Sequence, residues 1–381
     1  MRVLGPEKFG LVNFAAAFVT YFTIFTDYGF NLTATQEISV NRKNQDKINK
    51  IFSSVFVIKT VLFLIGLLVF LSLVFGIPKF YVDAPVYIFS FLAVFGSLLS
   101  PVWFFQGMEE MNYITVISVT VKAIWVIAVF LLIKNPADIL ILVILNGTSF
   151  VLIGIAGLIV VKIRYGVKFR KPSLTELKRQ LTEGWYVFMS TASITLYTTT
   201  NTFILGLFAG NEIVGYFSAA DKIKNAVQGL FNNAAQTVFP YLSKLFSESK
   251  IKAFKFVKNY MRLTVSVAIV LTLFMFIFSE DIVLLVLGNN YIPSITVFRI
   301  ILFLPLVILL SNIYGIQLML NLGFKKEFSR IIFLSGVFSV AVSLILVPVF
   351  YEIGTAITVL LTEILVTSQM YFFLKKKGIK I

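Results

Sequence analysis

The 381-residue sequence contains no cysteine and no histidine. Without cysteine the chain has no disulfides and no thiolate chemistry, and without histidine it lacks the commonest general base and metal ligand. A nucleotide-binding loop of the form Gly-x-x-x-x-Gly-Lys followed by Ser or Thr is also missing, so ATP is not expected to drive the protein directly. These absences exclude most familiar catalytic and metal sites, and no cofactor is expected.

Hydrophobic residues make up 58% of the chain, well above the roughly 45 to 50% of soluble proteins. Long apolar runs separated by short connectors predict an all-α polytopic membrane protein with no sizeable soluble domain. We predict eleven membrane spans, at residues 9–30, 51–75, 84–106, 113–133, 139–161, 185–208, 213–240, 261–278, 295–320, 328–350 and 353–374.

Lysine and arginine are distributed unequally between the two sets of connectors. One alternating set, with the adjoining helix ends, holds 24 of the 33 basic residues, and the opposite set holds four. The positive-inside rule therefore predicts a cytoplasmic C-terminal tail. The net charge of +15 follows from this rule, so nucleic acid is not an expected partner.

The segment from Gly210 to Lys244 is long enough to span a bilayer but carries a row of polar residues along one helical face. A weaker copy lies 205 residues earlier, where Gly5, Glu7 and Gly10 match Gly210, Glu212 and Gly215. Because amides and carboxylates are costly in hydrocarbon, both polar faces are expected to line a wet cavity or a partner helix. The repeat predicts two related lobes around one central cavity.

Polar and charged residues within the spans are the candidate site residues. For Lys59 and Arg299, which lie near predicted helix ends, the alternative is that the side chain snorkels to the membrane surface. For Asp221 with Lys222 or Lys224, the alternative is a structural ion pair. We predict substrate-binding cations at Lys122, Lys222, Lys224 and Arg299; a polar cavity lining of Asp27, Asn31, Ser190, Ser193, Tyr197, Asn201, Ser218, Asp221, Asn225, Gln228, Asn232 and Gln236; and ion-coupling carboxylates at Asp27, Asp221 and Glu363.

The connector at 162–184 divides the chain into an N-terminal lobe, 1–161, and a six-span C-terminal lobe, 185–381. Ser173 and Glu176 have the spacing of a capping box, which predicts a short amphipathic helix on the cytoplasmic membrane surface. It is expected to act either as a hinge or as an inert strap. The span before Gly210 has no counterpart in the N-terminal lobe, so that lobe is expected to lack its first helix.

Three stretches carry a resemblance to a known family: LGPEKFGLVNFAAAFVTYFTIFTDYGFN, GVKFRKPSLTELKRQLTEGWYVFMSTASITLYTTTNTFILGLF and VGYFSAADKIKNAVQGLFNNAAQTVFPYLSK. They resemble the bacterial O-antigen flippases, polysaccharide transporters of the multidrug/oligosaccharidyl-lipid/polysaccharide exporter superfamily. The resemblance implies twelve helices in two six-helix lobes, a V-shaped cavity and alternating access. It also implies a substrate, an oligosaccharide on undecaprenyl pyrophosphate, which moves from the cytoplasmic to the periplasmic leaflet. Membrane lipids and the O-antigen polymerase machinery are the other expected partners.

Two other functions are compatible with the sequence. A multidrug or cation antiporter of the same superfamily would share the two-lobe plan, but an acidic rather than a cationic cavity would suit cationic drugs. A membrane-embedded enzyme of glycan assembly would need catalytic residues in a large external loop. The longest predicted periplasmic loop, 279–294, offers only Glu280 and Asp281, so we expect a transporter and not an enzyme.

The charge distribution makes a topology prediction. Reporter tags at Lys377 and within 162–184 should be active only in the cytoplasm, and a tag within 209–212 only in the periplasm. Alkaline phosphatase and fluorescent-protein fusions measure both sides. A periplasmic signal from the tail would contradict both the orientation and the number of spans.

Overall fold

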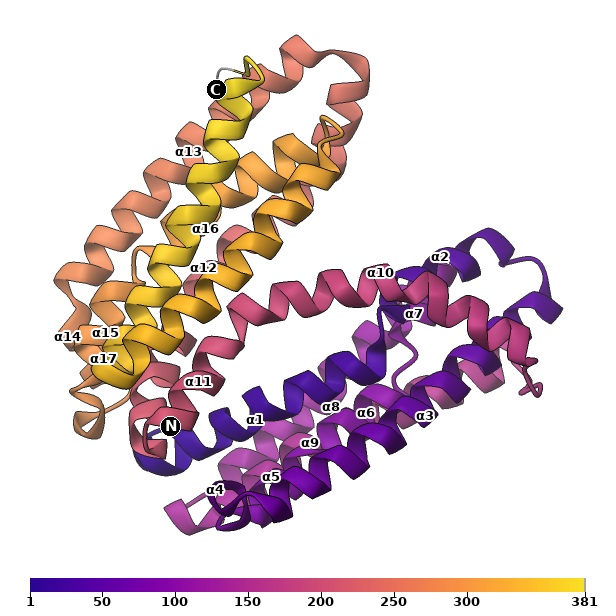
Figure 1. The fold of residues 1–381 in the computed structure, drawn as a ribbon, viewed down its shortest axis with the longest axis horizontal. Coiled ribbons are helices and arrows are strands. Elements are labelled where there is room, and N and C mark those ends of the chain that lie inside the picture. The colour runs from indigo at the N-terminus through magenta and orange to yellow at the C-terminus, as the bar shows by residue number, and fades with distance from the viewer. Residues whose placement is uncertain (380–381) are drawn as a thin grey trace. The chain divides into compact units, whose positions relative to one another are not determined.

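The computed structural model describes residues 1–379, together with all side chains among them except those of residues 190, 196, 197 and 240. The described chain consists of helices and short connections, with no strand (Figure 1). Its first half contains α1 (Gly5–Asp27), α2 (Phe30–Asn41), α3 (Gln45–Gly76), α4 (Pro78–Tyr81), α5 (Ala84–Ser90), α6 (Leu92–Leu99), α7 (Val102–Met108), α8 (Met111–Leu132), the short η1 (Pro136–Asp138) and α9 (Ile139–Tyr165). Its second half contains α10 (Leu174–Thr198), α11 (Thr200–Phe208), α12 (Asn211–Glu248), α13 (Lys250–Ile277), α14 (Ser279–Val286), η2 (Asn289–Tyr291), α15 (Ser294–Ile301), α16 (Leu304–Asn312), the π-helix η3 (Ile313–Leu320) and α17 (Lys325–Lys376).

All eleven predicted spans lie mainly on helix, which confirms the all-α membrane fold. Eight helical stretches in the described residues are long and apolar enough to cross a bilayer by themselves. Helices α10 and α12 are not among the eight, because their polar side chains lower the hydropathy, and α11 has only nine residues. Helix α17 is counted once, although the backbone of Tyr351 (φ 46°, ψ −121°) breaks it between the predicted spans 328–350 and 353–374. The protein is a multi-pass membrane protein.

The chain forms two compact units. The N-terminal unit comprises Phe14–Ala192, and the C-terminal unit comprises Met1–Asn13 with Ser193–Ile381. The chain therefore passes between the units within α1 and within α10. Lobe boundaries at 161 and 185 stay a prediction.

The start of α10 differs from the predicted short surface helix. The capping box is confirmed: the Ser173 amide donates to Glu176 Oε2 (2.8 Å), and the Glu176 amide donates to Ser173 Oγ (3.2 Å). The helix that it opens then continues without interruption to Thr198. The change from an amphipathic to an apolar pattern falls at Gly184, which does not end the helix. A Cβ added at Gly184 would lie 2.9 Å from the Tyr28 ring, so the glycine serves close packing inside α10.

Small residues let α6 and α9 pack closely in the N-terminal unit. A Cβ added at Gly96 would lie 2.5 Å from the Cβ of Phe150, and one added at Gly154 would lie 2.7 Å from the Cβ of Leu99. Lipid gives apolar helices little hydrophobic reason to associate, so such close van der Waals packing stabilises the pair. Nearby, Trp103, Phe104 and Phe105 of α7 enter an apolar core that includes α2 and α3.

The repeated glycines pack against each other in the C-terminal unit, where the start of α1 crosses the start of α12. A Cβ added at Gly10 would lie 1.7 Å from the carbonyl oxygen of Asn211, and one added at Gly215 would lie 2.0 Å from that of Pro6. Residues 6 and 10 correspond to 211 and 215 at the repeat spacing of 205. The crossing is therefore reciprocal, as in an isologous contact, and each repeat presents the same glycine to the other. The repeat seen in the sequence is a contact in the fold.

This crossing predicts a large difference between two glycines of α12. Gly215→Ala should destabilise the protein by about 1–3 kcal/mol, because the new methyl group meets backbone that cannot rotate away. Gly229→Ala should leave stability unchanged or raise it by up to about 1 kcal/mol, since a Cβ at Gly229 meets nothing within 4 Å. Thermal unfolding of the two purified variants in detergent measures the difference. Equal unfolding temperatures would show that the crossing is not tightly packed.

Candidate functional site

A buried ion pair lies where α1 ends in the N-terminal unit. Lys59 of α3 places its Nζ 2.9 Å from Asp27 Oδ1 and donates to the carbonyl of Ser97 at 2.7 Å. The Ser97 hydroxyl donates to the same carboxylate oxygen at 2.7 Å. Lys59 is only 2% exposed. A charge at this depth is unfavourable unless it is paired, so the three groups stabilise one another.

The alternative that Lys59 snorkels to the membrane surface is excluded, because its ammonium group is buried and held by Asp27 and Ser97. The helix is also longer than the predicted span, which begins at residue 51: α3 begins at Gln45, with Asn44 as its N-cap accepting from the Lys47 amide at 3.1 Å. Lys59 therefore lies fourteen residues, about 21 Å, from the helix start. The asparagine before a polar first turn was the sequence signal that could have placed the start correctly.

The chain breaks immediately after Asp27. Tyr28 (φ 45°) and Gly29 (φ 81°) both adopt left-handed backbone conformations, and α2 starts at Phe30. The Tyr28 ring stacks on Phe188 of α10, with centroids 5.1 Å apart, which holds the break against that helix. The break turns Asp27 and Asn31 toward a shared cavity of about 80 Å³, which Thr191 also lines. Two of the predicted cavity residues are thus brought together.

A second ion pair lies on α12 in the C-terminal unit. Lys224 Nζ is 2.9 Å from Asp221 Oδ1, and Asn225 Nδ2 donates to Asp221 Oδ2 at 2.7 Å. Lys224 is 7% exposed, and Glu363 of α17 lies within its electrostatic reach. The structural ion pair considered for Asp221 therefore forms with Lys224. Lys222, on a neighbouring face of the helix, is exposed and belongs to no ion pair found among the described residues.

The polar row of α12 continues toward the C-terminal end of the helix after this pair. Gln228 is buried and donates to Asn232 Oδ1 at 3.1 Å, while its own Oε1 has no hydrogen-bond partner among the described residues. Ser218 is also buried, whereas Asn225 and Gln236 are exposed. Some amides of this row bond to side chains of the same helix, and others keep donors or acceptors without a partner. Such a row can form hydrogen bonds with the hydroxyl groups of a polar solute.

The remaining predicted residues do not join these clusters. Asn201 bonds Ser339 of α17 at 3.1 Å within the C-terminal unit, and Arg299 donates from Nε to Ser279 Oγ at 2.7 Å. Lys122 is exposed on α8, and Ser193 is half-buried. The side chains of Ser190 and Tyr197 lie outside the described part of the chain. The predicted role of each residue in binding or coupling stays a prediction.

The sequence and the fold both match known proteins. Residues 1–246 match the model of a family described as polysaccharide biosynthesis protein. A candidate O-antigen transporter of Escherichia coli K12 is 36% identical over 98% of this chain and 90% of its own length, and one of Shigella dysenteriae is 30% identical over 97% and 92%.

Solved structures show the same fold at low identity. An inward-facing multidrug resistance transporter of the MATE family, within the MOP superfamily, superposes with a TM-score of 0.77 at 12% identity, covering 99% of this chain and 91% of that one. The lipid II flippase MurJ in an inward closed conformation gives a TM-score of 0.71 at 15% identity, covering 98% and 85%. The shared helical fold, the family match over more than half of the chain and the relatives that align over nearly all of it agree with one another: the chain belongs to the polysaccharide biosynthesis protein family of membrane transporters.

Proposed function

We propose that this protein is a flippase for undecaprenyl-pyrophosphate-linked oligosaccharides, such as O-antigen units, which it moves from the cytoplasmic to the periplasmic leaflet of the bacterial inner membrane by alternating access. It is a transporter rather than an enzyme. The C-terminal tail is cytoplasmic, and the O-antigen polymerase machinery acts on the delivered substrate. The relatives described as O-antigen transporters support this substrate class.

The observation that carries the proposal is the exposed polar and cationic face of α12. Pyrophosphate and glycan cannot cross hydrocarbon without replacements for their hydration, because each bare charge or unpaired polar group costs several kcal/mol or more. Lys222 can form charge-assisted hydrogen bonds to phosphate, and the exposed amides of Asn225 and Gln236 can bond sugar hydroxyls. Lys122, Lys224 and Arg299 are proposed to support the phosphate, and the lipid tail stays in the bilayer.

The paired carboxylates disfavour the multidrug antiporter alternative. A cation carrier needs carboxylates that are open to its substrate. In this chain Asp27 is held by Lys59 and Asp221 by Lys224, so both carboxylates are neutralised internally. The likeness to a MATE transporter concerns the fold alone.

Asp27, Asp221 and Glu363 are the proposed coupling carboxylates. Each lies close to a buried lysine, so a change in the protonation of the carboxylate would change the strength of its contact with that lysine. An ion gradient can act on such a pair, and the supply of substrate on one side with its consumption on the other can also drive net movement.

Lys222 is predicted to bind phosphate directly. Lys222→Gln should abolish surface glycan at normal protein levels, whereas Lys222→Arg, which keeps the charge, should retain part of it. Glycan immunoblots of a flippase-null strain carrying each variant measure this. Full surface glycan in the glutamine variant would remove Lys222 from the binding site.

Variants of the Asp27–Lys59 pair distinguish a structural role from a coupling role. Lys59→Met should destabilise the protein by about 1–3 kcal/mol, because it leaves the half-buried Asp27 carboxylate without its partner. The double variant Asp27→Asn with Lys59→Met should regain most of this stability but not surface glycan. Unfolding temperature and glycan display are measured on the same variants. Normal glycan display by the double variant would make the pair purely structural.

A further inference from the structure

Two neighbouring cavities lie at one end of the N-terminal unit, where α2, the start of α3 and the start of α10 meet. One has a volume of about 250 Å³ and the other about 700 Å³. Glu37 and Asn41 of α2 line both, so the two cavities adjoin. Their combined size is typical of a ligand site. Neither contains any residue of the α12 polar face.

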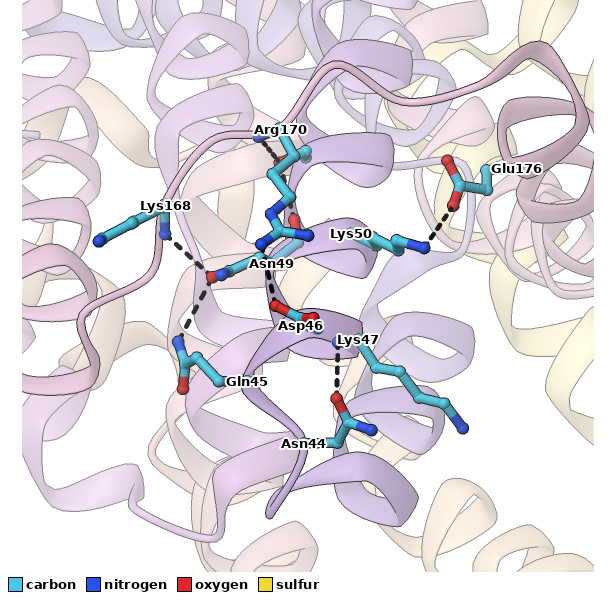
Figure 2. A network of polar contacts seen from close by, with 10 residues as sticks. Asn44, Gln45, Asp46, Lys47, Asn49, Lys50, Lys168, Arg170 and Glu176 are labelled. Carbon is cyan, nitrogen blue, oxygen red and sulfur yellow. Dashed lines mark hydrogen bonds and ion pairs between the residues drawn. The ribbon is translucent and has the colours of Figure 1, made fainter.

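The smaller cavity is basic. Lys47, Lys50 and Arg179 line it against two carboxylates, Glu37 and Glu176. Arg179 is held by Glu37 at 2.6 Å. Lys50 pairs with Glu176 (Figure 2), but their separation of 3.8 Å is at the outer limit of an ion pair. Lys47 takes part in no ion pair found among the described residues. Each ammonium group has three donors, so both lysines can accept an additional anion.

The larger cavity has the lining of a saccharide site. Gln36 supplies an amide that both donates and accepts, as sugar hydroxyls require. The hydroxyls of Thr33 and Thr182 donate to the carbonyls of Gly29 and Lys178 and offer acceptors to the cavity. Glu183 adds a strong acceptor. Tyr186 is 79% exposed and offers a flat aromatic face on which the apolar face of a sugar ring can pack.

The walls of these cavities are fixed by contacts between elements distant in the sequence. Arg170 bonds Asp46 at 2.9 Å, and the amides of Lys168 and Arg170 donate to Asn49 and to Ser53, both at 2.9 Å. Figure 2 shows how these contacts tie the segment before α10 to the first turns of α3. The capping box then fixes Glu176 at the start of α10. Such preorganisation reduces the entropy that a ligand must offset.

We propose that these two cavities form a docking subsite for a glycosyl diphosphate headgroup, with the phosphates against Lys47 and Lys50 and the first sugars beside Tyr186. The subsite rests on the proposed flippase function and adds to it a place of capture distinct from the α12 face. By the predicted topology it opens on the cytoplasmic side, where substrate is supplied.

The test uses purified full-length protein in nanodiscs of zwitterionic lipid. The probe is a short-chain prenyl pyrophosphate that carries one N-acetylhexosamine, and inorganic pyrophosphate is the sugar-free comparison. Lys50→Gln should weaken binding of both by about tenfold or more, since a charge-assisted contact is lost. Tyr186→Ala should weaken only the sugar-bearing probe. Lys178→Gln removes the same charge from an exposed position of α10 that lines neither cavity, and it should bind like the unaltered protein.

Three further results distinguish misfolding, a wrong subsite and a wrong function. Lys50→Arg should restore most of the affinity, which a loss through misfolding would not allow. If Lys50→Gln and Tyr186→Ala bind the probe normally while Lys222→Gln does not, the subsite is wrong and the flippase proposal stands. If the unaltered protein does not bind the probe, the proposed function fails as well.

An anionic lipid headgroup offers the same phosphate chemistry, so phosphatidylglycerol is added to the nanodiscs in a separate arm. The proposal predicts that the lipid leaves the Tyr186-dependent binding of the sugar-bearing probe in place. Two results together would overturn the proposal and assign the basic cavity to membrane lipid. Phosphatidylglycerol would displace the probe from the unaltered protein, and Lys50→Gln would abolish binding of the lipid at the same concentrations.

Discussion

A charged side chain inside a membrane helix is unfavourable by several kcal/mol unless it meets an opposite charge, a hydrogen bond or water. The two units meet this constraint in different ways. In the N-terminal unit the pair joins two helices, with Asp27 on α1, Lys59 on α3 and Ser97 bonded to both. In the C-terminal unit Asp221 and Lys224 are one turn apart on the same helix. Both arrangements neutralise buried charge, and the second leaves Lys222 outside the pair and open to solute.

The repeat explains how the polar helices are positioned. Gly10 and Gly215 allow α1 and α12 to approach until the backbone of one touches the other, so these two helices are fixed at their starts by the same residue type. Polar residues then follow in both helices. In α1 many of these satisfy themselves: Asn13, Thr20 and Thr23 each donate to the carbonyl four residues earlier. The polar face of α12 carries more amides than that of α1, together with Lys222. This agrees with the sequence, in which the α1 copy of the repeat is the weaker one.

The sequence alone predicted the helical class, the positions of the long helices, the capping box and the polar face, because each depends on local pattern. It left open whether Lys59 snorkels, since its partners Asp27 and Ser97 lie on other helices and no local pattern shows that they meet. It also ended the helix after Ser173 too early, because amphipathic and apolar segments can continue in one helix. The cavities beside α2 and α10 could not be found in this way. Lys47, Lys50 and Arg179 counted only as positive-inside charge until the fold brought them together.

The central claim is that this chain moves a lipid-linked oligosaccharide across a bilayer. Reconstitution into liposomes that contain undecaprenyl-pyrophosphate-linked oligosaccharide tests it most directly, with the fraction of glycan on the outer surface followed by a membrane-impermeant glycan-labelling enzyme. The protein should make glycan from the inner leaflet accessible without ATP and in proportion to the number of active molecules. Accessibility no greater than in protein-free liposomes, together with saturable uptake of cationic dyes by the same preparation, would contradict the account and favour a drug antiporter.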